Sequence, residues 1–149
     1  MGSFSWMRSV FYKITLSLLL ILVACGKKNQ SSDPDSPQIS YFSFVKQLPT
    51  DPQTAVFKIH FSARSKINQG KVLFFMGSQD SDPLELPLSE ILLNNGISDD
   101  VLEGDIGVAI RFATPEQAKA SYILYVQIED NEDRRSNLAQ IKLDFVRKS

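Results

Sequence analysis

Hydrophobic and polar residues alternate one by one along much of the chain after residue 37, which is the period of a β-strand with one buried face. The clearest case is the segment 54–63, in which Phe57, Ile59 and Phe61 alternate with polar residues. Segment 71–76, KVLFFM, is apolar without interruption after Lys71, which predicts a strand covered on both faces. Alternation also predicts strands at 38–46, 106–112, 122–128 and 139–145.

The stretch between residues 77 and 105 has a weaker pattern. We expect a loop at 77–87 with a short edge strand inside it, and an acidic loop at 99–105. Two interpretations of 88–93 are open: a helical turn capped by Ser89 and ended by Gly96, or a strand before the Asn95-Gly96 turn. We favour a strand or an irregular piece. Six or seven short strands without a long helix predict an all-β protein, an antiparallel β-sandwich.

The first predicted strand is apolar on both faces. One phase contains Ile39, Tyr41, Ser43 and Val45. Phe42 and Phe44 lie on the other phase, and Phe75 is likewise out of phase with its neighbours. We expect these three phenylalanines in the core, the alternative being an exposed apolar patch for a partner.

The segment Thr114–Leu124, TPEQAKASYIL, begins with Thr-Pro, a helix-start signature, and continues into a strand that starts at Tyr122. It resembles the end of an immunoglobulin-like domain, where one helical turn leads into a strand that begins with the tyrosine of the tyrosine corner. The resemblance implies an immunoglobulin-like sandwich of about seven strands with Tyr122 as a structural residue. Leu124 stands where antibody domains have a cysteine, so the resemblance is to the wider class of bacterial surface and envelope modules.

The first 24 residues have the layout of a secretory signal peptide, which we expect to be helical. Arg8 and Lys13, without any acid, are followed by an apolar run from Ile14 to Ala24 that ends in small residues. The run is too short for a transmembrane helix, which needs about 20 apolar residues.

The run ends in Leu22-Val23-Ala24-Cys25, which resembles the bacterial lipobox, a small residue before an invariant cysteine. The resemblance implies cleavage between Ala24 and Cys25, a diacylglycerol on the Cys25 sulfur, and acylation of the new amine by a fatty acid such as palmitate. Gly26, rather than Asp, follows the cysteine, and under the sorting rule of well-studied Gram-negative bacteria this favours the outer membrane over the inner membrane. The alternatives are an uncleaved signal anchor and a buried cysteine in a core helix.

These features divide the chain into three parts. Residues 1–24 are the expected lipoprotein signal peptide, residues 25–37 a lipidated, flexible tether, and residues 38–149 the β-sandwich domain. Removing the signal changes the net charge from −1 to −3, because it contains Arg8 and Lys13 and no acid. A slightly acidic domain of this kind is not expected to bind nucleic acid. The only cysteine is used for lipid, so the fold must stand without a disulfide.

His60 is the only histidine, and it lies on the polar phase of its strand. A catalytic histidine needs a nucleophile and an orienting acid, and a zinc site needs several His or Cys ligands. The sequence offers neither, so we expect a solvent-facing residue, no enzyme activity and no cofactor.

Acidic residues gather in predicted loops, and β-sandwiches often bind calcium at such loop ends with carboxylate and carbonyl oxygens. Arg134 and Arg135 follow one acidic loop directly and are expected to neutralise it. Solvated loop charge is the favoured interpretation, with calcium as the alternative. The candidate calcium ligands are Asp99, Asp100, Asp105, Asp130 and Asp133.

Together the patterns predict a membrane-anchored lipoprotein whose single sandwich acts as a binding or structural module in the bacterial cell envelope. Its partner is expected to be an envelope protein or a glycan. Two alternatives stay open: a small envelope enzyme or the accessory subunit of one, and a calcium-binding adhesion module.

Overall fold

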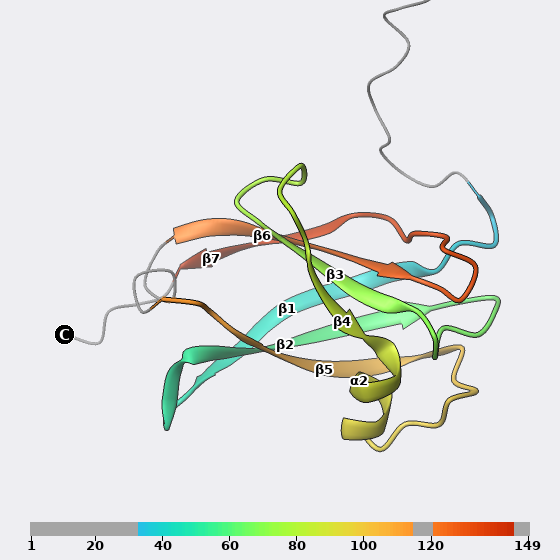
Figure 1. Ribbon diagram of the computed structural model, residues 1–149, viewed down its shortest axis with the longest axis horizontal. Helices are drawn as coiled ribbons and strands as arrows, with labels where there is room; N and C mark the ends of the chain where they lie inside the picture. Colours follow the sequence, from blue (N-terminus) through green and yellow to red (C-terminus); the bar gives the residue numbers. More distant parts are fainter. Residues whose placement is uncertain (1–32, 115–120, 145–149) are drawn as a thin grey trace, which may run out of the picture.

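The computed structural model describes residues 33–114 and 121–144. In chain order they form seven strands and one short helix (Figure 1). The elements are β1 (Gln38–Leu48), β2 (Asp51–Ser62), β3 (Lys71–Met76), β4 (Leu84–Pro87), α2 (Leu88–Asn94), β5 (Glu103–Arg111), β6 (Ser121–Glu129) and β7 (Ala139–Asp144).

The strands form two sheets that lie one above the other in Figure 1. Sheet A has the order β1-β2-β5 and sheet B the order β4-β3-β6-β7. Every neighbouring pair of strands is antiparallel. The predicted antiparallel β-sandwich is therefore confirmed. The alternating segments at 54–63, 106–112 and 122–128 fall on β2, β5 and β6, and the described part of the segment 139–145 falls on β7.

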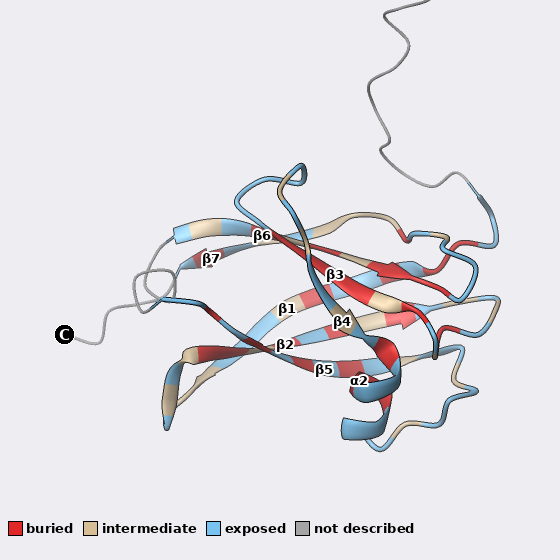
Figure 2. Ribbon diagram, in the orientation of Figure 1, coloured by how far each residue is buried: buried red, intermediate tan, exposed pale blue. Residues whose placement is uncertain are grey.

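The core lies between the sheets, because alternate residues of each strand face the opposite sheet. Figure 2 shows buried residues along the strands of both sheets and on α2. At the centre, the rings of Phe42 and Phe57 from sheet A meet Phe74 from sheet B, with centroids 5.8–6.1 Å apart. β3 is buried on both faces, as its uninterrupted apolar run predicted.

β1 departs from the predicted phase because a β-bulge interrupts its pairing with β2. Ile39 pairs with Phe61 and Tyr41 pairs with His60, which leaves Ser40 as an extra residue. Ile39 and Phe42 are therefore both buried, whereas Tyr41 is 54% exposed. The expectation that Ile39, Tyr41, Ser43 and Val45 share one face was wrong for this reason.

The three phenylalanines expected in the core have different positions. Phe42 and Phe75 are buried, which confirms the prediction for both. Phe44 packs against Phe57 at a centroid distance of 5.9 Å, but it lies on the edge strand β1 and is 40% exposed.

Residues 88–94 form the helix α2, so the strand or irregular piece that we favoured was wrong and the helical alternative was right. Leu88, Ile91 and Leu92 have the i, i+3, i+4 spacing that puts them on one helix face, and all three are buried in the core. The predicted cap is not used: Pro87 precedes the helix and no side chain caps it. Gly96 has φ +66°, a conformation that favours glycine, and it turns the chain away after the helix.

An asparagine side chain pairs with each edge strand of sheet A. On β1, Asn137 Oδ1 accepts the N–H of Ile39 at 2.7 Å, and Asn137 Nδ2 donates to the Ile39 carbonyl at 3.0 Å. On β5, Asn95 makes the same two bonds to Gly107, at 2.7 and 2.9 Å. Both asparagines belong to segments that follow strands of sheet B, so their amides join the two sheets at both lateral edges.

Gly70 lies so close to the backbone of Glu129 that the position has no room for a side chain. A Cβ atom at Gly70 would lie 1.9 Å from the carbonyl oxygen of Glu129, whereas a Cβ at Gly104 would lie 3.7 Å from its nearest neighbour. We expect Gly70→Ala to lower the free energy of unfolding by about 1–3 kcal/mol or more, because the backbone must move to admit the methyl group. Gly104→Ala should change it by less than about 0.5 kcal/mol.

Urea denaturation of the two variants measures this difference. Equal effects at the two glycines would show that the contact between Gly70 and Glu129 does not constrain the fold.

Candidate functional site

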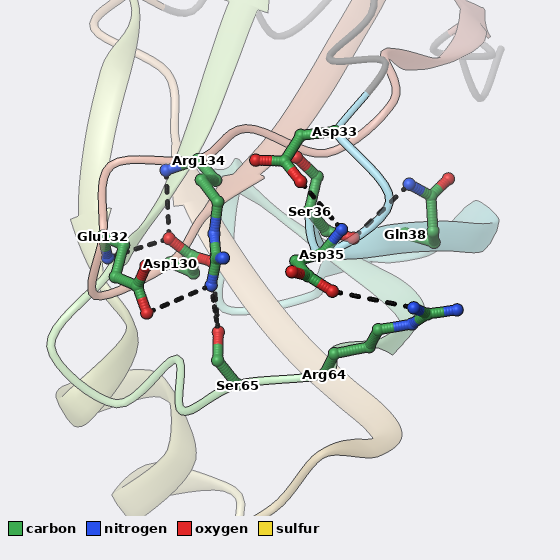
Figure 3. A network of polar contacts seen from close by, with 9 residues as sticks. All are labelled: Asp33, Asp35, Ser36, Gln38, Arg64, Ser65, Asp130, Glu132 and Arg134. Atoms are coloured by element: carbon green, nitrogen blue, oxygen red, sulfur yellow. Dashed lines mark hydrogen bonds and ion pairs between the residues drawn. The ribbon is translucent and has the colours of Figure 1, made fainter.

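Three segments meet at the end of the sandwich where the described chain begins, which we call the N-terminal end: residues 33–37, 63–70 and 129–138 (Figures 1 and 3). Ser36 and Pro37, which the sequence placed in the tether, are buried there. Arg64 forms an ion pair with Asp35 at 3.6 Å. The last part of the expected tether is therefore attached to the sandwich.

A buried carboxylate, Asp130, organises this end (Figure 3). Its Oδ1 accepts the backbone N–H groups of Glu132 and Arg134 at 2.9 and 3.0 Å. Its Oδ2 accepts Arg134 Nε at 2.8 Å and the Ser65 hydroxyl at 3.3 Å. The Arg134 guanidinium also donates to Ser65 Oγ at 2.5 Å, which ties the 129–138 loop to the 63–70 loop.

The charge on Asp130 is stabilised although its side chain has no exposed surface. Burial raises the pKa of Asp130, but the two backbone N–H donors and the Arg134 guanidinium together outweigh it and hold the pKa below the ordinary 3.8. The hydrogen bond to Asp130 in turn raises the pKa of Arg134. Since its oxygens already accept four hydrogen bonds, Asp130 acts as a structural clamp rather than as a group open to a ligand.

A second buried carboxylate, Glu129, lies on the outer face of sheet B beside this clamp. It pairs with Lys71 on β3 at 3.4 Å and with Arg135 at 2.9 Å. Lys71 also contacts Glu85 on β4 at 3.0 Å, and this hydrogen bond is the main reason why the pKa of Lys71 is raised. The network connects β4, β3, β6 and the following loop.

His60 lies on the outer face of sheet A, as its polar phase predicted. Its Nδ1 is 2.8 Å from Asp105 Oδ1, and its Nε2 is 3.6 Å from Glu103 Oε1. Lys58 binds the other oxygen of Asp105 at 2.8 Å, and this bond, followed by the contact with His60, lowers the pKa of Asp105. Both ring nitrogens face carboxylates, so neither is directed at a hydroxyl that it could activate.

The structure does not bring the five candidate calcium ligands together. Asp99 and Asp100 lie in the loop before β5, where Asp100 pairs with Lys66 at 2.7 Å, and Asp105 lies on sheet A. Asp130 is the buried clamp, and Asp133 follows it in the same loop with φ 59°. Among the described residues, no three His, Cys, Asp or Glu side chains are grouped so that they could hold a metal ion. Calcium binding stays an untested prediction.

Tyr122 lies at the start of β6 with its ring against Phe112, at a centroid distance of 5.9 Å and an interplanar angle of 71°. Burial raises the pKa of its hydroxyl. The turn that would complete a tyrosine corner includes residues 115–120, which lie outside the described residues, as do Ala24 and Cys25. The corner, the cleavage site and the lipidation site stay predictions.

The sequence analysis missed two contributors to the N-terminal end. Ser65 contacts Asp130 across 65 positions of sequence, and Asn137 contacts Ile39 across 98. No local pattern indicates such pairs. The neutralising role expected of the two arginines after the acidic loop is confirmed, because Arg134 pairs with Asp130 and Arg135 with Glu129.

Comparison with known proteins identifies the fold and no family. No family model matches the chain, and no curated protein sequence matches it. Among solved structures, the sandwich is similar to a Niemann-Pick type C2 protein from the Japanese carpenter ant, with a TM-score of 0.51 and 13% identity over 78% of this chain and 97% of that one. At this identity the likeness concerns the fold, and the predicted immunoglobulin-like sandwich is confirmed.

No helix within residues 33–114 and 121–144 is both long and apolar enough to cross a membrane.

The Asp130 clamp predicts an acid-sensitive domain. The pKa of Asp130 is lower in the folded chain than in the unfolded chain, so its contribution to stability is present above the unfolded value of about 4 and is lost as the pH falls through the folded value. Asp130→Asn removes the buried carboxylate that pairs with the largely buried Arg134 and should lower the free energy of unfolding at pH 7 by about 3 kcal/mol, near the lower limit for broken buried pairs.

Glu132→Gln is the matched control, because the Glu132 side chain is exposed and contacts the same arginine at 3.3 Å. Urea denaturation between pH 3 and pH 7 should show a large loss and a flatter pH dependence for Asp130→Asn only. The same small effect for both variants would contradict the clamp.

Proposed function

We propose that this chain is a bacterial lipoprotein, anchored through lipid on Cys25, whose β-sandwich is a binding or structural module in the cell envelope. The observation that carries the proposal is the lipobox Leu22-Val23-Ala24-Cys25 at the end of a basic and then apolar leader. Cys25 is the only cysteine, and seven residues, 26–32, separate it from Asp33, where the described sandwich begins.

The spacing and the fold support a defined orientation. Eight steps of about 3.5 Å each limit the distance from Cys25 to Asp33 to roughly 28 Å. A relaxed flexible linker of this length spans only about 16 Å. We therefore propose that the N-terminal end faces the membrane, with the Asp130 clamp beside the segment 33–37 at which the anchored chain enters the sandwich.

The opposite end of the sandwich then faces away from the membrane. β7 runs from Ala139, close to the N-terminal end, to Asp144 at the far end, where the β1–β2 turn and the start of β6 also lie (Figure 1). Among the described residues, the outer face of sheet A exposes Tyr41 and His60, and this face and the far end are the surfaces that we propose for an envelope protein or a glycan. The acidic net charge fits such partners better than it fits nucleic acid.

Substitution of the lipobox cysteine tests the anchor. Cys25→Ala should leave the unprocessed precursor, without incorporated palmitate, because the cysteine sulfur must carry diacylglycerol before the signal is removed. Ala24→Ser keeps a small residue before the cysteine and should still be processed and labelled. The measurement is a gel shift combined with palmitate labelling in a bacterial host. If the Cys25→Ala chain is still cut before residue 25, the leader is an ordinary signal peptide and the lipoprotein proposal is wrong.

The residue after the cysteine tests the outer membrane location separately. Gly26→Asp should move the processed, palmitate-labelled protein from the outer to the inner membrane, because an aspartate at this position resembles the retention signal of well-studied Gram-negative lipoproteins. Separation of the two membranes on a sucrose gradient measures the shift, with Gly26→Ser as the control. If the protein without the substitution already lies in the inner membrane, the proposed outer-membrane location is wrong, but the proposed lipid anchor on Cys25 is not affected.

A further inference from the structure

The amide of Asn95 closes one lateral edge of the sandwich. It follows α2, which continues from β4 of sheet B, and it pairs with Gly107 on β5 of sheet A. Asn95 Oδ1 accepts the Gly107 N–H at 2.7 Å, and Nδ2 donates to the carbonyls of Gly107 and Ile91 at 2.9 and 2.7 Å. A Cβ atom at Gly107 would lie 3.2 Å from Asn95 Oδ1, so glycine permits this approach. We call these three hydrogen bonds the Asn95 latch.

Asn95 is also the only asparagine in the chain that precedes a glycine. In such a pair the backbone nitrogen of the glycine can attack the side-chain amide carbon of the asparagine. The new C–N bond closes a five-membered succinimide, and the side-chain nitrogen leaves as ammonia. Water then opens the ring to aspartate or isoaspartate. Glycine has no side chain that hinders the attack.

We propose that Asn95 is a site of spontaneous deamidation that is protected while the latch is closed and that cannot close the latch again once it is converted. Protection follows from the geometry. The three bonds of the latch hold the side-chain amide on Gly107 and Ile91, and we expect them to oppose its approach to the Gly96 nitrogen. The Gly96 N–H itself donates to the carbonyl of Leu93 at 3.0 Å, which also opposes the attack.

The product cannot restore the latch because a carboxylate has no N–H donor. One of its oxygens can still accept the Gly107 N–H. The other must face the carbonyl oxygens of Gly107 and Ile91, and these three acceptors repel one another. Isoaspartate also adds a backbone methylene directly before Gly96, whose φ of +66° shapes the turn after the helix. Conversion therefore releases the end of α2 from β5. Because conversion requires an open latch, the converted residue identifies molecules in which this edge has opened.

Asn137 provides an internal control. It holds Ile39 on the other edge of sheet A by the same pair of bonds, at 2.7 and 3.0 Å. Leu138 follows it, and the leucine side chain hinders ring closure. The two residues thus share the structural role but differ in chemical reactivity.

The first experiment follows conversion in the full-length chain, held in detergent, either folded or in denaturant at the same pH and temperature. Peptide mass spectrometry measures the amide-to-acid mass change at both asparagines. Conversion of Asn95 should be at least about tenfold slower in the folded chain, because the reaction occurs only in the open fraction. Asn137 should stay unconverted over the same period in both conditions. Equal rates at Asn95 in the folded and denatured chains would overturn the proposal.

The second experiment measures what conversion does to the edge. Hydrogen exchange of the Gly107 amide and of α2 should become at least about tenfold faster in Asn95→Asp. The control Asn94→Asp adds the same charge at the exposed neighbouring position and should leave exchange unchanged. Unchanged exchange in Asn95→Asp would show that a carboxylate closes the edge as well as the amide does, which would also overturn the proposal.

Discussion

The fold depends on the apolar contact between its two sheets, with Phe42, Phe57 and Phe74 at its centre. Two of these rings come from sheet A and one from sheet B, so the cluster directly joins the layers. Residues 26–149 contain no cysteine, and no disulfide can connect the sheets within this part of the chain. Burial of apolar surface is therefore the main force that holds the layers together.

Polar contacts then decide how the edges of this apolar core are closed. α2 covers one lateral edge with Leu88, Ile91 and Leu92, and the Asn95 amide fixes its end to β5. The Asn137 amide fixes the other edge at β1. Each amide satisfies one N–H and one carbonyl of an edge strand, groups that would otherwise attract another chain. At the N-terminal end, the buried pair of Asp130 and Arg134 fixes the loop beside the point where the chain enters the sandwich.

The parts of the fold that could be predicted are those set by local pattern. The strict alternation in β2, and the polar phase of His60 within it, placed both faces of that strand correctly. The bulge at Ser40 could not be predicted, because it depends on the pairing of β1 with β2. The helix α2 was missed since a seven-residue segment with only four apolar residues fits a strand and a helix equally well until its neighbours are known. The Asp130 clamp shows the same limit: its acids and arginines were visible in the sequence, but its contact with Ser65 was not.

We propose that lipid on Cys25 attaches the sandwich to a membrane. The most direct test is the mass of the N-terminal peptide of the mature protein, extracted from bacterial membranes and digested with a protease. We expect a peptide that begins at Cys25 and contains a diacylglycerol on its sulfur. A peptide that begins elsewhere, or one in which Cys25 has a free thiol, would contradict it.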